Sequence, residues 1–183
     1  SIKKAIISDQ DFFNFIYNNS KGILKLNSEK IHELVFKSIN SKIYFSASDI
    51  KENYLRLFLN YGHTFGQSLE SYYKINQNKI THGEAVSLGM ICAAKMQSII
   101  YKDKTIIELH KDILGKYNLP KKISDIKNLR KPDYNKLIYN LTNDKKKTFE
   151  HIRFILCNKI GHPHIYKTNN KTIIKKSFEE VII

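Results

Sequence analysis

The stretch from Leu55 to Met96 constrains the fold more than any other part of the chain. Arg56, Asn60, His63 and Gln67 lie at offsets 0, 4, 7 and 11, which fall in one narrow sector of an α-helix. The neighbouring positions are mostly Leu, Phe and Tyr. A polar stripe on an otherwise apolar helix predicts a single helix through these residues, with its stripe facing a buried, hydrated cavity.

Two glycines interrupt this apolar helix on a neighbouring face. Gly62 and Gly66 are four residues apart, so they lie one turn from each other. Each costs about 1 kcal/mol relative to alanine in a helix interior. The pair therefore indicates that another backbone, or a ligand, comes close to the helix at this point.

A second helix follows, and its start is marked in the sequence. Thr81 and Glu84 have the spacing of a capping box, with Thr81 as the N-cap. His82 then lies in the first turn of a helix that is rich in Ala, Ser and Gly, which is typical of tight packing. We therefore expect His63 and His82 to converge from two helices on one cavity.

Length and composition indicate one globular domain spanning residues 1–183. Hydrophobic residues make up 42% and charged residues 26%, and no apolar run has the length of a membrane span. Cys92 and Cys157 lie in apolar surroundings, which favours buried thiols over a disulfide. These thiols, together with the absence of a visible secretory signal, predict a cytoplasmic protein without a membrane partner.

The formal net charge of +14 raises the alternative of a nucleic-acid-binding domain. The lysines are scattered, however, and no recognition motif accompanies them. Solvated surfaces and an anionic phosphorylated substrate account for the charge better, so the prediction is that nucleic acid is not a partner. The nucleic-acid hypothesis would require DNA binding with a steep salt dependence.

At the two histidines the sequence resembles a known family. GHTFGQSLE followed by HGEAVSLGM is similar to the signature of 3-dehydroquinate synthase, a sugar-phosphate cyclase, whose usual pattern is GHTFGH and then HGEAV. The resemblance implies that His63 and His82 bind a catalytic divalent metal, zinc or cobalt. It also implies that Arg56 and Asn60, which match family residues in type and spacing, contact the substrate.

Other parts of the chain match the family more loosely. Lys3 corresponds to a family lysine, and Lys42 to another one that precedes the arginine by fourteen residues. Lys145 and Lys146 lie in a DKK sequence whose lysine contacts substrate in the family. Gln67 replaces the second histidine of GHTFGH, so at this catalytic position it can donate a hydrogen bond but cannot carry a proton at neutral pH.

The resemblance also predicts what this domain works with. Ser1 falls one position after the family's glutamate, the third zinc ligand, and the chain contains no glycine-rich nucleotide-binding turn. NAD is therefore expected to bind mainly to an N-terminal domain that is absent from this chain, within a homodimeric full-length enzyme. That enzyme would convert 3-deoxy-arabino-heptulosonate 7-phosphate, a phosphorylated keto acid, to 3-dehydroquinate and phosphate in the shikimate pathway, and the present chain alone would be inactive.

The predicted fold is mainly α, the C-terminal helical metal- and substrate-binding domain of the dehydroquinate synthase-like fold. Besides the two central helices, we expect helices at 5–17 with a break at 9–11, at 28–42, 106–117, 134–141 and 171–183, a turn at 19–22, and a minor β-hairpin near 151–166. Two enzymatic alternatives remain, a sister sugar-phosphate cyclase and a metal-dependent polyol dehydrogenase.

Overall fold

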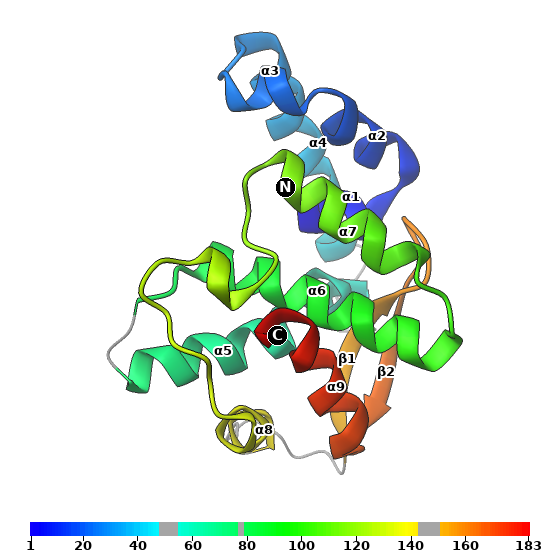
Figure 1. Ribbon diagram of the computed structural model, residues 1–183. Helices are drawn as coiled ribbons and strands as arrows, with labels where there is room; N and C mark the ends of the chain where they lie inside the picture. Colours follow the sequence, from blue (N-terminus) through cyan, green and yellow to red (C-terminus); the bar gives the residue numbers. More distant parts are fainter. Residues whose placement is uncertain (48–54, 77–78, 143–150) are drawn as a thin grey trace.

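The computed structural model describes residues 1–47, 55–76, 79–142 and 151–183 (Figure 1). In chain order the elements are α1 (Ile2–Ser8), α2 (Gln10–Asn18), α3 (Ser20–Leu24), α4 (Ser28–Ala47), η1 (Leu55–Asn60), α5 (His63–Ile75), α6 (His82–Tyr101), α7 (Thr105–Lys116), η2 (Ile123–Asp125), α8 (Tyr134–Thr142), β1 (Ile152–Cys157), β2 (Pro163–Thr168) and α9 (Lys171–Ile182). Helices dominate and the two strands form one antiparallel pair, which confirms the predicted fold class.

Helix α6 lies at the centre of the molecule, with α5, α7, α9 and β1 packed around it (Figure 1). Nearly every residue from Ala85 to Ser98 is buried, on all sides of the helix. A helix that is apolar or small all round has to be covered on every face. The many Ala, Ser and Gly residues allow several elements to approach it at once.

The closest of these approaches is the crossing of α5 and α6. A Cβ atom added at Gly89 of α6 would lie 2.0 Å from the carbonyl oxygen of Gly62 and 2.7 Å from the amide nitrogen of Gly66. At Gly66 itself an added Cβ would lie 2.9 Å from the oxygen of Ala85. The close backbone approach predicted from Gly62 and Gly66 is therefore confirmed, and its tightest point is Gly89.

The prediction of a single helix across residues 55–69 is wrong. Leu55–Asn60 forms a 3₁₀ helix, and α5 begins only at His63. Between them Gly62 has φ +76°, a left-handed conformation that glycine adopts without steric cost. This turn redirects the chain, so that Arg56 and Asn60 do not continue the helical face of His63 and Gln67.

The N-terminal helices follow the predicted pattern with two differences. The break is present at Asp9, where the backbone is extended. The Asp9 side chain caps α2 by accepting a hydrogen bond from the amide of Phe12 at 2.7 Å. The turn predicted at 19–22 is instead the short helix α3, because burial of Ile23 and a contact between Asn19 and the Phe15 carbonyl continue the helical path. Helix α4 also runs beyond residue 42, since Phe45 is buried at its C-terminal end.

The hairpin and the C-terminal helices lie where the sequence predicted them. In the hairpin Ile152 pairs with Thr168 and Cys157 with Pro163, and Gly161 takes a left-handed conformation at the connection. Helix α9 packs on α6 beside β1, with Ile174, Phe178 and Val181 buried. Both cysteines are buried free thiols, as expected, and burial raises the pKa of Cys157 to about 12.

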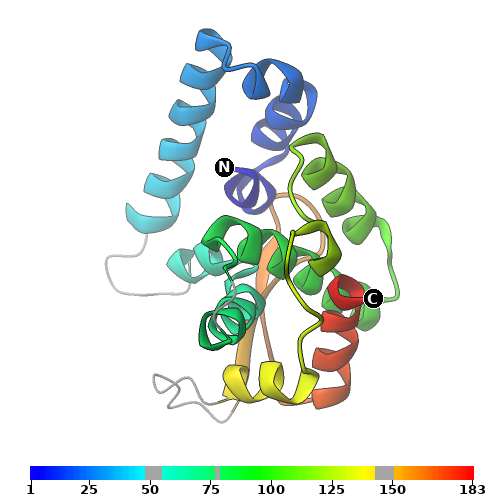
Figure 2. The same ribbon diagram turned by 60° about the vertical axis from the view of Figure 1, so that its left-hand side comes forward.

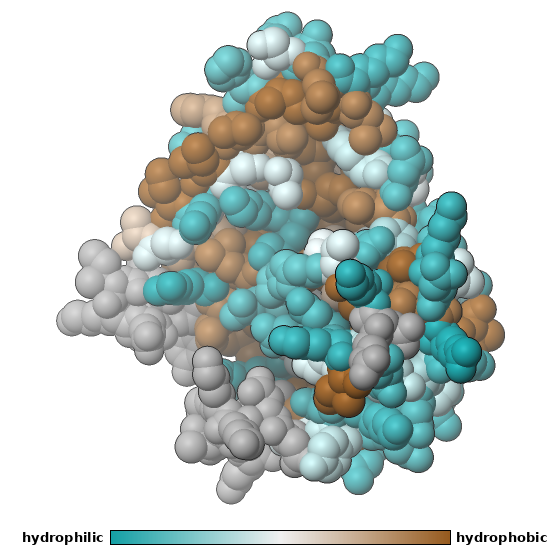
Figure 3. Space-filling model, turned by 90° about the vertical axis from the view of Figure 1, so that its left-hand side faces the viewer, coloured by the Kyte–Doolittle hydropathy of each residue, from teal (hydrophilic) through white to brown (hydrophobic). Residues whose placement is uncertain are grey.

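Helices α1 to α4 form the upper part of the molecule, where α4 stands at one side (Figure 2). Four apolar residues of α4 are exposed within one face of the helix: Val35, Phe36, Ile39 and Ile43. Figure 3 shows a band of apolar surface at this level of the molecule. Among the described residues, no helix has both the length and the hydropathy needed to cross a membrane.

A buried hydrogen-bonded pair anchors the turn before α5. The hydroxyl of Tyr61 donates to His110 Nε2 at 2.8 Å, because His110 Nδ1 faces the carbonyl oxygen of Ile106 at 2.6 Å and must carry the proton. Both aromatic side chains are fully buried. This contact joins residues 49 positions apart, so no local sequence pattern indicates it.

His110 makes stability depend on pH. Burial lowers its pKa from 6.5 to about 4, so the folded protein keeps it neutral while the unfolded chain protonates it below pH 6.5. The stability from neutral His110 is complete above pH 6.5 and is lost as the pH falls towards 4. We expect His110 to lower the free energy of unfolding by about 2 kcal/mol between pH 7.5 and pH 5. Denaturant titrations at several pH values should show this fall in the free energy of unfolding in the wild type and a smaller fall in His110→Gln. An equal fall in both proteins would contradict the role of His110.

Candidate metal and substrate site

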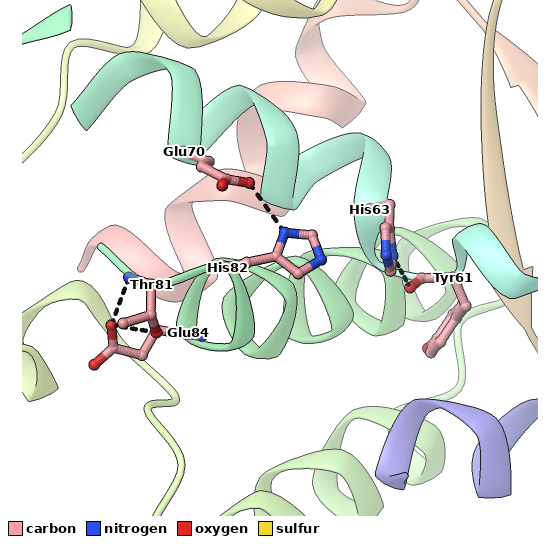
Figure 4. Close-up of polar contacts among 6 residues, drawn as sticks. All are labelled: Tyr61, His63, Glu70, Thr81, His82 and Glu84. Carbon is pink, nitrogen blue, oxygen red and sulfur yellow. Dashed lines mark hydrogen bonds and ion pairs between the residues drawn. The ribbon is translucent and has the colours of Figure 1, made fainter. Parts of the chain in front are cut away.

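His63 and His82 face each other across the N-terminal ends of α5 and α6 (Figure 4). Each is the first residue of its helix, and their ring centres are 5.3 Å apart. The predicted capping box fixes the second helix start: the amide of Glu84 donates to Thr81, and the Glu84 carboxylate accepts from the Thr81 amide at 2.8 Å. The predicted convergence of the two histidines is confirmed.

In each imidazole ring, a hydrogen bond at Nδ1 sets the orientation. His63 Nδ1 lies 3.1 Å from the carbonyl oxygen of Tyr61, and His82 Nδ1 lies 3.1 Å from Glu70 Oε2 (Figure 4). A carbonyl and a carboxylate only accept, so Nδ1 carries the proton in each ring. In the neutral form each Nε2 then has a free lone pair, which is the arrangement that metal-binding histidines use.

These two rings fit a shared zinc or cobalt ion. Two imidazoles that bind one tetrahedral zinc through nitrogens at about 2.0–2.1 Å have ring centres about 5 Å apart, close to the separation seen here. Within the described ranges, no group of three or more His, Cys, Asp or Glu side chains could hold a metal. The described residues therefore bring two histidines to this point, and Glu70 contacts Nδ1 of His82.

A basic environment surrounds His63. Burial, and next the charge of Lys3, lower the pKa of His63, which favours the neutral form that binds metal. Lys3 donates to the carbonyl of Leu59, and burial together with the charge of Lys4 lowers the Lys3 pKa to about 8. Lys3 is thus held beside the histidine.

A cavity of about 450 Å³ adjoins the two histidines. Lys3 and Lys4 lie in its wall with His63 and His82. Apolar side chains of α1 to α4 and α6, with Tyr117 and Leu119, complete the wall. Lys4 Nζ donates to the carbonyl of Ser38 at 3.0 Å, and its pKa is lowered by burial and by the charge of Lys42. No acidic side chain of the described chain forms an ion pair with Lys3, Lys4 or Lys42, so this side of the cavity suits an anion.

The other candidate residues are placed differently from the prediction. Arg56, Asn60 and Gln67 are exposed, so the stripe does not face a buried cavity. Lys42 is exposed on α4, although its charge acts on Lys4. Lys145 and Lys146 lie outside the described residues. The sequence reasoning missed Lys4 and Glu70; Glu70 lies seven residues after His63, two helical turns along α5, and that spacing could have revealed it.

Residues 1–147 match the family model for the 3-dehydroquinate synthase C-terminal region. This chain belongs to that family. A 3-dehydroquinate synthase of Clostridium tetani (strain Massachusetts / E88) is 35% identical over 182 residues, covering 99% of this chain and 46% of that protein. A 3-dehydroquinate synthase of Pelagibacter ubique (strain HTCC1062) is 36% identical over 179 residues, covering 94% of this chain and 46% of that protein. The chain thus spans about half the length of these relatives.

Solved structures show the same fold. A 2-epi-5-epi-valiolone synthase from Streptomyces hygroscopicus subsp. jinggangensis 5008, with NAD⁺ and Zn²⁺ bound, superposes with a TM-score of 0.78 at 15% identity, covering 98% of this chain and 48% of that one. A 2-deoxy-scyllo-inosose synthase complexed with carbaglucose-6-phosphate, NAD⁺ and Co²⁺ superposes with a TM-score of 0.75 at 26% identity. The match covers 98% of this chain and 49% of that one. The fold of this family member is therefore that of the sugar-phosphate cyclases.

Proposed function

We propose that this chain is the metal- and substrate-binding C-terminal half of a 3-dehydroquinate synthase. The complete enzyme would convert 3-deoxy-arabino-heptulosonate 7-phosphate to 3-dehydroquinate and phosphate. The observation that carries the proposal is the pairing of His63 and His82, with both Nε2 atoms free, within a family match that covers most of the chain. NAD would bind mainly to an N-terminal half, in keeping with the longer relatives, of whose length this chain spans about half.

The residues of this chain would bind and orient the substrate. His63 and His82 would hold the divalent metal, which when bound polarises hydroxyl and carbonyl oxygens as a Lewis acid. Lys3 and Lys42, with Arg56, would bind the carboxylate and phosphate of the substrate by charge-assisted hydrogen bonds. Asn60 and Gln67 would add neutral hydrogen bonds, and Lys145 or Lys146 a further cation. The exposure of Arg56, Asn60 and Gln67 supports a site that is completed by another part of the enzyme.

The direct test is to assay a complete enzyme that carries these residues. It should release phosphate and form 3-dehydroquinate from the heptulosonate phosphate only when NAD and Zn²⁺ or Co²⁺ are both present. Residues 1–183 alone should show no turnover, because the NAD site and a third metal ligand are expected elsewhere. Turnover by this chain alone would contradict the proposal, and so would a complete enzyme that binds metal and NAD but does not use this substrate.

A second candidate, a sister sugar-phosphate cyclase, is favoured by two observations. Gln67 stands where the 3-dehydroquinate synthase pattern has histidine, and the chain is 26% identical to a 2-deoxy-scyllo-inosose synthase of the same fold. Identifying the product made from each sugar phosphate by mass spectrometry separates the two candidates. A product other than 3-dehydroquinate would favour the sister activity.

Gln67 also leads to a quantitative prediction. It lies one turn after His63 on α5, so it should reach the same substrate. A positioned acid–base group typically contributes about 10²–10⁴ in rate, and an amide retains the hydrogen bond but not the proton. We expect Gln67→His to raise kcat of the complete enzyme by less than about 10², with KM little changed. A fall in kcat, or a change confined to KM, would show that Gln67 has another role.

A further inference from the structure

We propose that Glu70 is the positioning residue of the metal site: its carboxylate holds His82 in the orientation and tautomer that binds metal. The inference rests on the proposed metal site and adds a residue to it. Glu70 Oε2 lies 3.1 Å from His82 Nδ1, and Figure 4 shows the carboxylate directed at the ring. With the proton on Nδ1, Nε2 of His82 is left to face His63 as a ligand.

The helices hold Glu70 opposite His82. Glu70 is on α5, two turns after His63, so both project from one face of that helix. The glycine crossing at Gly62, Gly66 and Gly89 fixes α5 against α6, from which His82 projects. The packing of α5 on α6 therefore sets the distance between the backbones from which the carboxylate and the imidazole project.

The other acid near His82 in sequence has a different task. Glu84 Oε2 accepts from the amide and the hydroxyl of Thr81, each at 2.8 Å, and so caps α6. The Glu84 carboxylate is therefore directed at Thr81, the N-cap of α6. Glu70 is the acid that the described structure pairs with the His82 ring.

The two histidines differ in how they are oriented. His63 is held by the backbone carbonyl of Tyr61, which no side-chain substitution removes. His82 depends on a side chain, so its orientation can be tested by mutation. Glu70 is 38% exposed and His82 60% exposed, so the contact contributes little to the core and its loss should leave the fold intact.

The experiment measures metal affinity in the complete enzyme by competition with a chromophoric chelator, using Zn²⁺ alone. Substitutions of residues that orient a metal-bound histidine cost about 10–100-fold in metal affinity, and we expect this loss in Glu70→Ala. Glu70→Gln should lose less, because its amide oxygen still accepts from Nδ1. The matched control is Glu33→Ala, which removes a carboxylate of 40% exposure paired with Lys37 on α4, and it should leave the Zn²⁺ affinity unchanged.

The visible spectrum of bound Co²⁺ provides a second readout, because it reports the coordination geometry directly. It should change in Glu70→Ala and remain as in the wild type in Glu33→Ala. Equal Zn²⁺ affinity and equal Co²⁺ spectra for wild type and Glu70→Ala would overturn the inference, as would a wild type that binds neither metal. A wild type that binds Zn²⁺ in a Glu70-dependent way but forms no 3-dehydroquinate would overturn the proposed substrate and support the role of Glu70.

Discussion

Replacing Gly89 with alanine is expected to lower the free energy of unfolding by about 3 kcal/mol or more, at the upper end of the usual cost of overpacking. The added Cβ would lie 2.0 Å from the Gly62 carbonyl oxygen, which is a backbone atom that no rotamer change can move away. Helices α5 and α6 would have to separate at their crossing. Denaturant unfolding of the wild type and the variant measures the difference.

The same helix provides a matched control for this substitution. An added Cβ at Gly83 meets nothing within 4 Å, so Gly83→Ala should leave stability unchanged or raise it by less than about 1 kcal/mol. If Gly89→Ala were as stable as Gly83→Ala, the close crossing of α5 and α6 would be wrong. Since this crossing also sets the separation of His63 and His82, Gly89→Ala should weaken metal binding even where the variant folds.

The second large effect is expected from His63→Ala in the complete enzyme. The substitution removes one of the two proposed protein ligands that this chain supplies, and the described residues contain no group of three or more His, Cys, Asp or Glu side chains that could hold the metal instead. Zn²⁺ affinity should fall by more than the roughly 10–100-fold expected for a residue that only orients a ligand. Turnover should fall below detection even with NAD and substrate in excess, and chelator competition and a phosphate-release assay measure the two effects.

A control shows whether this loss is specific to the site. His32 is an exposed histidine on α4, and His32→Ala should retain both metal affinity and turnover. The size of the loss of Zn²⁺ affinity is also informative. It should be largest in His63→Ala, smaller in Glu70→Ala and smallest in Glu70→Gln. Zn²⁺ bound with wild-type affinity by His63→Ala would show that the metal site lies elsewhere.

Much of the architecture was predictable because it depends on interactions between residues close in sequence. The capping box of Thr81 and Glu84 specifies where α6 begins, and Asp9 specifies the break before α2. The small residues of α6 predicted a tightly packed helix, and the structure shows it buried on all sides. The glycine pair at 62 and 66 predicted the close contact, although it did not identify the partner helix.

Other features depend on contacts between distant residues, and only the tertiary structure decided them. The polar stripe looked continuous because helical periodicity assumes regular geometry, but Gly62 takes a left-handed turn where α6 comes close, and this ends the stripe. Tyr61 and His110 meet because α7 packs on α6 and brings His110 to the turn before α5, a long-range contact that no local sequence pattern indicates. Glu70 can be seen to hold His82 only once the glycine crossing has set the distance between their helices. The local sequence thus determined the helices and the residue types of the proposed metal site, whereas long-range packing determined how those residues are oriented.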